Sequence, residues 1–428
     1  MRSNLLGMSS FTGRRRLLAL ATALLAAAPA AAAAAPQARP TFELREVFSP
    51  DGSITRVRMP VQAPTSVASV AAARAAVNGV TALQVTGPSS KKFDLVVVGD
   101  GYTSAERARF ERHARSKVAE IFSVEPFRNY RDLFNVWLVD VTSKQSGVDN
   151  DPSLGVAKDT ALDMEFWCNG TERLLCVDQA KASAAADRAP DVDQVLALGN
   201  STKYGGAGGG VATASGGEAR SGQIAIHELG HSIGELADEY DSPYPYGPHV
   251  GDAPEANATV FPGPVMTELE TKWTPWMGKP TPDGGVIGSF MGARYNPVVY
   301  YRPSENSIMR SLGRAYNLVG REAMLVAFYK TARPITISSP GGSAAGWTAK
   351  LTVRVQRPRD HALTITWTLD GKVLAAAQNA TSLNLFPLRR SDGKAHTVRV
   401  VVSDRTGWVI DPVARATHLT ESRSWTVR

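Results

Sequence analysis

The residues whose types and spacing could do chemistry form the motif His227-Glu228-Leu229-Gly230-His231. Two histidines four positions apart on a helix lie about 40° apart around its axis and about 6 Å apart along it, so both imidazoles can reach one metal ion. A Zn²⁺ ion accepts such nitrogens at about 2 Å, and Glu228 would lie beside the open coordination position. The spacing therefore predicts metal-assisted hydrolysis, in which Glu228 accepts a proton from the attacking water and returns it to the leaving amine.

The residues around this motif predict a buried helix. Residues 224–226 before the motif and Ile233 after it are uncharged, which suits a helix face packed against a sheet. A surface helix with a chance His-Glu pair would carry charges at these positions. We therefore expect a helix over residues 223–234, with Gly234 as its stop.

A third metal ligand is expected from the segment after this helix, and Asp238 is the candidate. In an unbroken helix Asp238 would lie about 16 Å along the axis from His227, too far to share a ligand shell of about 2 Å. Asp238 can bind only if the chain doubles back, which Gly234 would permit. Glu239, His249 and a residue further on are alternatives, and Asp238 could instead hold a ligand histidine in place.

Five segments together resemble the immunoglobulin-A-peptidase family of bacterial secreted zinc metallopeptidases, in the HExxH zincin group. They are residues 227–240 (HELGHSIGELADEY), 98–103 (VGDGYT), 125–132 (EPFRNYRD), 200–206 (NSTKYGG) and 301–310 (YRPSENSIMR). The resemblance implies a peptidase fold with one catalytic Zn²⁺ ion, for which the candidate ligands are His227, His231 and Asp238 from the spacing argument above. It also implies a Met-containing turn beneath the metal, for which Met309 is the candidate, with Tyr301 as a loose candidate for stabilising the oxyanion.

Apolar runs that alternate with helix signals predict the elements that position the motif. Residues 93–98 are nearly all apolar, which is typical of a strand buried on both faces, and a capping box over residues 103–106 begins a helix. The fold class is therefore α/β. The resemblance implies that residues 91–334 form an α+β zincin-like catalytic domain. Other expected elements are a glycine-rich loop beside the site at residues 204–210, strands at 134–141, 192–198 and 211–214, and a helix at 319–332.

The C-terminal part has a different pattern. From residue 335 onward, short segments alternate apolar and polar residues and are separated by Gly, Asp and Pro turns. The segments are residues 351–355, 363–369, 396–402 and 424–427. Residues 335–428 are therefore predicted to form an all-β immunoglobulin-like sandwich.

The N-terminal part is predicted to be a signal peptide followed by an extension. Four arginines and no acid precede an apolar run and an alanine-rich stretch with small residues, so residues 1–35 have the order of an export signal. Residues 36–90 are read as an N-terminal extension and linker, and they include an extended pair over residues 41–59 that turns at 49–52. The protein is thus expected outside the cytoplasm, secreted or periplasmic.

Composition and charge narrow the class of protein. The chain of 428 residues is 43% hydrophobic and 20% charged, which is ordinary for a folded soluble protein. Removal of the four leader arginines lowers the formal charge from +7 to +3, and no basic cluster indicates a nucleic-acid partner. No apolar run reaches the roughly 20 residues of a transmembrane anchor. The only two cysteines, Cys168 and Cys176, are expected to form a disulfide in an exported protein.

These observations favour a secreted zinc-dependent endopeptidase with Glu228 as general base. Its partner would be a protein or peptide substrate, bound in extended conformation along residues 211–214. The same metal chemistry would also serve a zinc amidohydrolase acting on a non-protein or cell-wall amide. A third interpretation is a surface-binding protein that uses the sandwich and keeps a vestigial site, although the intact His-Glu-His set argues against it.

Overall fold

The computed structural model of the chain describes residues 42–242 and 251–428. The expected signal peptide and His249 therefore lie outside the described residues. The described residues mix helices and strands, as expected for the α/β class, and belong to one compact unit, Thr41–Arg428. Among them, no helix combines the length and the apolar character that crossing a membrane would require.

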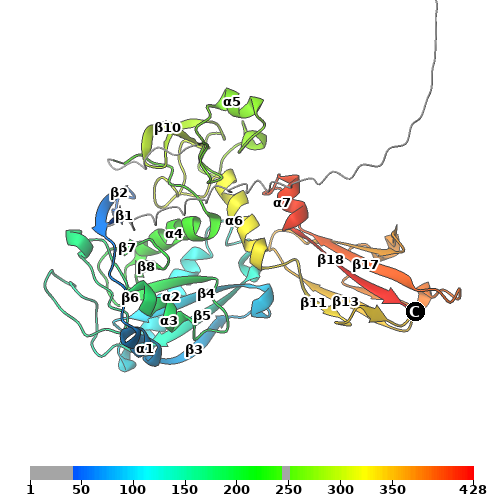
Figure 1. The fold of residues 1–428 in the computed structure, drawn as a ribbon, viewed down its shortest axis with the longest axis horizontal. Coiled ribbons are helices and arrows are strands. Elements are labelled where there is room, and N and C mark those ends of the chain that lie inside the picture. The colour runs from blue at the N-terminus through cyan, green and yellow to red at the C-terminus, as the bar shows by residue number, and fades with distance from the viewer. Residues whose placement is uncertain (1–41, 243–250) are drawn as a thin grey trace, which may run out of the picture. The chain divides into compact units, whose positions relative to one another are not determined.

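A six-stranded mixed sheet is the scaffold of the catalytic part (Figure 1). Its four middle strands are parallel, and each edge strand runs antiparallel to its neighbour. In spatial order the strands are β3 (Val77–Gln84), β5 (Phe134–Val141), β4 (Phe93–Asp100), β6 (Gln194–Gly199), β8 (Ala212–Ser215) and β7 (Gly206–Ala207). The strands predicted at residues 93–98, 134–141, 192–198 and 211–214 are all confirmed.

Helices cover both faces of this sheet because successive side chains of a strand point to opposite sides. Leu95 and Val97 of β4 belong to one hydrophobic core, whereas Val96 and Val98 belong to another. The first core contains residues of α2 (Arg107–Ile121), α4 (Gly222–Gly234) and α6 (Leu318–Thr331), and the second contains residues of α1 (Val67–Ala75) and α3 (Gln179–Ala186). The apolar run is thus buried on both faces, as predicted, and α4 belongs to the first of the two layers.

An N-terminal hairpin precedes the sheet. Strands β1 (Phe42–Phe48) and β2 (Ile54–Pro60) pair antiparallel from Phe42 opposite Pro60 to Phe48 opposite Ile54. The turn at residues 49–52 is where the sequence predicted it, and Gly52 there has a φ of 87°. Among the described strands, β1 and β2 pair only with each other, so the hairpin is not part of the six-stranded sheet.

Two long connections join elements of the catalytic part. The predicted disulfide is formed between Cys168 and Cys176, in the long connection between β5 and α3. The connection between α4 and α6 contains α5 (Gly263–Glu268) and a two-stranded sheet of β9 (Phe290–Ala293) and β10 (Asn296–Arg302).

The C-terminal part contains two sheets around a common core that includes Trp367 and Trp425. One sheet has the order β11-β13-β16, with β11 (Ile335–Ser339), β13 (Lys350–Val355) and β16 (Ser382–Asn384). The other has the order β12-β18-β17-β14-β15, with β12 (Ala344–Ala345), β18 (Thr420–Val427), β17 (His396–Ser403), β14 (Thr364–Leu369) and β15 (Lys372–Val373). The immunoglobulin-like character of this part stays a prediction.

The catalytic part and the C-terminal part contact each other. Val409 and Leu419, on either side of α7 (Pro412–Thr417), are buried in the core that also contains α2, α4 and α6. The hydroxyls of Tyr130 and Tyr329 both donate hydrogen bonds to the buried Asp404. The domain boundary at residue 334 therefore stays a prediction of the strand pattern.

Candidate metal centre

Helix α4 carries both motif histidines with their Nε2 atoms directed to one point. His227 Nδ1 lies 2.9 Å from the carbonyl oxygen of Ile308, and His231 Nδ1 lies 2.6 Å from that of Leu236. Since a carbonyl can only accept, each Nδ1 carries the hydrogen. The lone pairs of both Nε2 atoms are therefore available, which is the usual state of a histidine that binds a metal.

The end of α4 differs from the expectation in one respect. Gly234 is the last helical residue, and the chain reverses at Glu235, which has the left-handed φ of 50° and ψ of 38°. Backbone hydrogen bonds from Glu235 to His231 and from Leu236 to Gly230 close the helix, as in a Schellman motif. The predicted helix stop at Gly234 is confirmed, but the left-handed conformation belongs to Glu235. The lack of a side chain at Gly234 serves packing, since a Cβ there would lie 2.6 Å from Met324 Sδ.

The reversal brings Asp238 back to the histidines. His227 Nε2 lies 3.1 Å from His231 Nε2 and 3.2 Å from Asp238 Oδ1, and His231 Nε2 lies 3.3 Å from Asp238 Oδ1. Glu46 Oε2, from β1, is 3.3 Å from His227 Nε2 and 3.6 Å from His231 Nε2. Four atoms placed tetrahedrally about 2 Å from a zinc ion are separated by about 3.3 Å. These five distances are therefore close to the edges of a tetrahedral ligand shell.

Two buried oxygens at this centre indicate that a cation belongs there. Asp238 Oδ1 is buried and accepts no hydrogen bond from the described residues, although the two imidazoles are close. The other oxygen of this carboxylate accepts a hydrogen bond from the Tyr295 hydroxyl. Glu228 Oε1 is likewise buried without a described hydrogen-bond partner. Because an unpaired buried carboxylate oxygen is costly, this donor set fits a metal ion such as Zn²⁺.

The alternatives to Asp238 do not reach this point. Glu239 is fully buried and points into a polar network, where it accepts hydrogen bonds from Asn257, Ser307 and Asn317. Burial raises the pKa of Glu239, while these hydrogen bonds act to lower it. His249 lies outside the described residues.

Met309 lies directly beneath α4, where the resemblance predicted a Met-containing turn. It is buried, and a Cβ on Gly230 would lie 2.6 Å from its sulfur. The motif glycine is thus required for the close approach of this turn. Tyr301, the loose oxyanion candidate, does not line the site cavity, whereas Tyr295 does.

The charges of the cluster shift the pKa of each member. Burial opposes protonation of His227, but the neighbouring Glu46 and Asp238 outweigh it and raise the pKa of His227 to about 10. Burial would raise the pKa of Glu46, but His227 and His231 hold it well below its usual range. Burial, with the negative charge of Glu46, raises the pKa of Glu228 to about 8. In the absence of a metal, protons on the imidazoles therefore supply the positive charge that a dication would supply.

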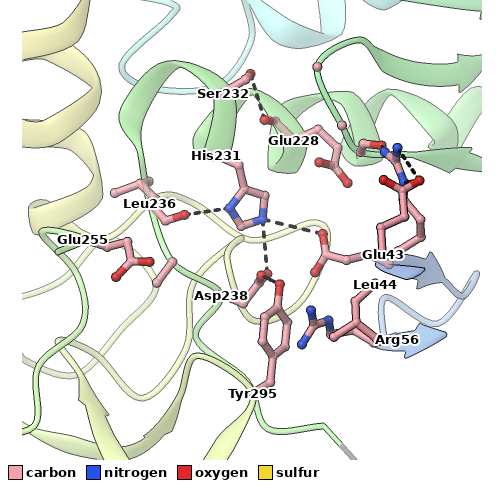
Figure 2. A pocket seen from close by; sticks show the side chains of 16 residues that line it. Glu43, Leu44, Arg56, Glu228, His231, Ser232, Leu236, Asp238, Glu255 and Tyr295 are labelled. Carbon is pink, nitrogen blue, oxygen red and sulfur yellow. Dashed lines mark hydrogen bonds and ion pairs between the residues drawn. The ribbon is translucent and has the colours of Figure 1, made fainter. Parts of the chain in front are cut away.

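A cavity of about 480 Å³ opens onto the cluster. Figure 2 shows His231 and Asp238 directed toward each other inside it, with the strands of the hairpin facing them. The predicted glycine-rich loop borders this cavity with residues 208–210, and a Cβ on Gly208 would lie 2.0 Å from Glu228 Oε2. The backbone that follows edge strand β7 thus lies against the expected general base.

Glu46 is the member of the cluster that sequence reasoning missed. It precedes the motif by 181 positions and lies in a segment interpreted as an extension and linker. Glu46 and its neighbours Arg45 and Val47 do not form a known metal-binding motif. A single glutamate in a strand does not by itself indicate a metal ligand. Only the docking of the hairpin reveals it.

A buried helix that carries His-Glu-x-x-His on a mixed sheet, with a returning carboxylate at the same point, is the arrangement of a metallopeptidase. The family model described as IgA peptidase M64 matches residues 81–284, the family that the resemblance implied. A search of curated proteins found no match to the chain.

Proposed function

We propose that the protein is an exported zinc-dependent endopeptidase. His227, His231 and Asp238 hold one zinc ion, and Glu228 is the general base. The observation that carries this proposal is the near-tetrahedral spacing of nitrogen and carboxylate atoms around one point, next to a glutamate oxygen without a described hydrogen-bond partner. The family match supports a peptidase, and the donor types support zinc.

The chain's own groups have defined tasks in this reaction. A zinc ion supplies a Lewis acid that acidifies water and polarises the scissile carbonyl. Glu228 Oε1 has no other described partner, so it is available to take a proton from the attacking water. Glu228 then delivers this proton to the leaving nitrogen as the C–N bond breaks. The carbonyls of Ile308 and Leu236 keep both imidazoles in the orientation that the metal needs.

The substrate path differs from the one expected along residues 211–214. Strand β8 is hydrogen-bonded to β6 on one side and to β7 on the other, so neither of its edges is available to a peptide. The outer edge belongs to β7, whose continuation through residues 208–210 borders the cavity beside Glu228. We propose that an extended peptide binds along this edge.

Export is supported by two independent features. The order of charges, apolar residues and small residues in residues 1–35 is that of a signal peptide. The Cys168–Cys176 disulfide is typical of oxidising compartments.

The test combines metal analysis with substrate profiling. Purified protein should contain one zinc ion per chain by elemental mass spectrometry, and it should cleave internal bonds in a proteome-derived peptide library. A chelator should abolish cleavage, and added zinc should restore it. Cleavage of cell-wall peptides alone would instead support the amidohydrolase, and zinc-free protein without activity would overturn the proposal.

A further inference from the structure

The hairpin β1–β2 occupies the place where a peptide would have to bind. Arg45 of β1 donates a hydrogen bond to the carbonyl oxygen of Gly208, next to the edge strand. Val47 is buried together with Ala207 of β7. Phe48 is buried with its ring against His227, at 5.4 Å between ring centroids. Strand β1 thus contacts both the edge strand and the metal-binding helix.

Glu46 closes the coordination position that a catalytic site needs. A catalytic zinc ion has three protein ligands and an open fourth position, whereas four protein ligands are typical of structural sites. Glu46 Oε2 is at the fourth corner, 3.3 Å from His227 Nε2. The Tyr240 hydroxyl donates to the other oxygen, Oε1, which fixes Oε2 in its direction toward the site.

The attachment of the hairpin is suited to release. It shares no strand pairing with the described strands of the large sheet. It is held by side-chain packing, in which Phe48 and Ile54 are buried with Tyr204, and by single hydrogen bonds such as those from Arg173 to the Phe48 carbonyl and from the Leu312 N–H to the Gly52 carbonyl. The connector of residues 61–64 is exposed and lies outside any helix or strand. The hairpin also precedes residues 81–284, the part matched by the peptidase family model.

We propose that residues 42–60 form an inhibitory hairpin, in which Glu46 is the fourth metal ligand and β1 fills the substrate cleft. Hydrolysis of one peptide bond within residues 61–64 allows the hairpin to leave and opens the fourth position to water and substrate. This inference rests on the proposed zinc peptidase activity and adds its regulation.

The experiment compares the full chain with Glu46→Gln, and with Asp51→Asn as a matched control. Asp51 is an exposed carboxylate in the turn of the same hairpin and hydrogen-bonds only to Ser53 among the described residues. Each protein is loaded with Co²⁺ and titrated with acetohydroxamate, a small chelating ligand that needs an open metal position. Glu46→Gln should change the visible Co²⁺ spectrum and lower the apparent Kd for acetohydroxamate at least about tenfold, because a competing internal ligand is removed.

Peptide hydrolysis by the zinc-loaded proteins gives a second measurement. Glu46→Gln should raise kcat/KM at least about tenfold, and Asp51→Asn should match the unmodified chain. A second variant has the recognition sequence of a site-specific protease inserted between Gln62 and Ala63, and its cleavage should produce the same spectral change and the same gain. This variant decides the matter if Glu46→Gln does not fold.

The remaining outcomes separate the two proposals. Bound metal with an unchanged spectrum and unchanged acetohydroxamate affinity in both variants overturns the inhibitory role alone. A Glu46→Gln protein that loses both metal and activity shows a resident ligand, which also overturns it. If neither the unmodified chain nor its variants bind metal, the proposed zinc peptidase fails and the inference fails with it.

Discussion

At the scale of single residues, the direction of each hydrogen bond determines what the site can do. The backbone carbonyls of Ile308 and Leu236 keep the Nδ1 hydrogens of the two histidines in place and leave both Nε2 atoms for a metal. The Tyr295 hydroxyl donates a hydrogen bond to one oxygen of Asp238, and the other oxygen of this carboxylate faces the imidazoles. The proposed metal ligands and the proposed general base are thus different side chains, so the two roles can be tested separately.

The variant Glu228→Gln should retain zinc but lower kcat/KM by a factor of about 10²–10⁴, because an amide cannot accept the proton of the attacking water. Zinc content by elemental mass spectrometry and hydrolysis of a fluorogenic peptide check the two parts of this prediction. Glu235→Gln, an exposed change one residue beyond the same helix, should leave both values unchanged. Near-normal activity of Glu228→Gln would falsify its role as general base.

The variant Asp238→Ala should raise the Kd for zinc at least about 100-fold, since loss of a direct ligand should exceed the effect of losing an outer-shell partner. Competition with a zinc-sensitive dye measures this Kd. Asp241→Asn removes an exposed carboxylate three residues later and should bind zinc as tightly as the unmodified chain. Equal zinc affinity in Asp238→Ala and the control would exclude Asp238 as a ligand.

At the scale of elements, local patterns predicted most of the fold and part of the site. The apolar run of β4, the capping box before α2 and the uncharged flanks of α4 each express a local preference, and all three elements form as expected. The position of Glu46 could not be predicted, because it depends on docking between segments far apart in sequence. Glycine propensity predicts that Gly234 adopts the left-handed conformation after α4, but Glu235 adopts it. Close packing against Met324 is the reason why position 234 needs a residue without a side chain.

The conformation of Glu235 leads to a prediction on stability. A residue with a side chain is strained in the left-handed region, whereas glycine is not, so Glu235→Gly should raise the free energy of unfolding by about 0.5–1 kcal/mol. Equilibrium denaturation in urea measures the change. Glu235→Ala removes the same carboxylate and keeps a Cβ, so it should not reproduce the gain, and equal values for the two variants would contradict the explanation.

At the scale of the whole molecule, the candidate metal centre joins strand β1 to a segment distant in sequence, helix α4 with the loop after it that carries Asp238. A ligand that binds only the folded state stabilises it, by about 4 kcal/mol at a thousand times its Kd. Removal of zinc by a chelator should therefore lower the Tm by several degrees, and the same buffer with chelator saturated by zinc should not. An unchanged Tm after confirmed zinc loss would argue against a site that ties these segments together.

The same centre predicts a pH dependence for the metal-free protein. The pKa of His227 is raised to about 10, so the stability from its protonated form is complete below the unfolded value of about 6.5 and is lost as the pH rises toward 10. The raised pKa of Glu228 acts in the same direction up to about pH 8. The Tm of metal-free protein should thus fall between pH 6.5 and about 9.5. The Tm of zinc-loaded protein should fall less over the same pH range, because zinc replaces the imidazole proton. Equal falls in Tm with and without zinc would contradict an origin in the metal centre.

The Cys168–Cys176 disulfide implies an order for three events: oxidation, docking of the inhibitory hairpin and cleavage of its connector. Both sulfurs are buried beside Val47 and Met59, so the bond builds part of the surface on which the hairpin rests. Asn169, inside the closed loop, also donates a hydrogen bond of 2.5 Å to the backbone of the hairpin at Arg58. In a newly made chain, oxidation should therefore come first, docking of the hairpin second and cleavage of the connector last. A thiol reductant should therefore weaken the docking of the hairpin without cleavage of the connector. Oxidising surroundings, which form the disulfide, would thus also keep the peptidase inhibited until the connector is cleaved.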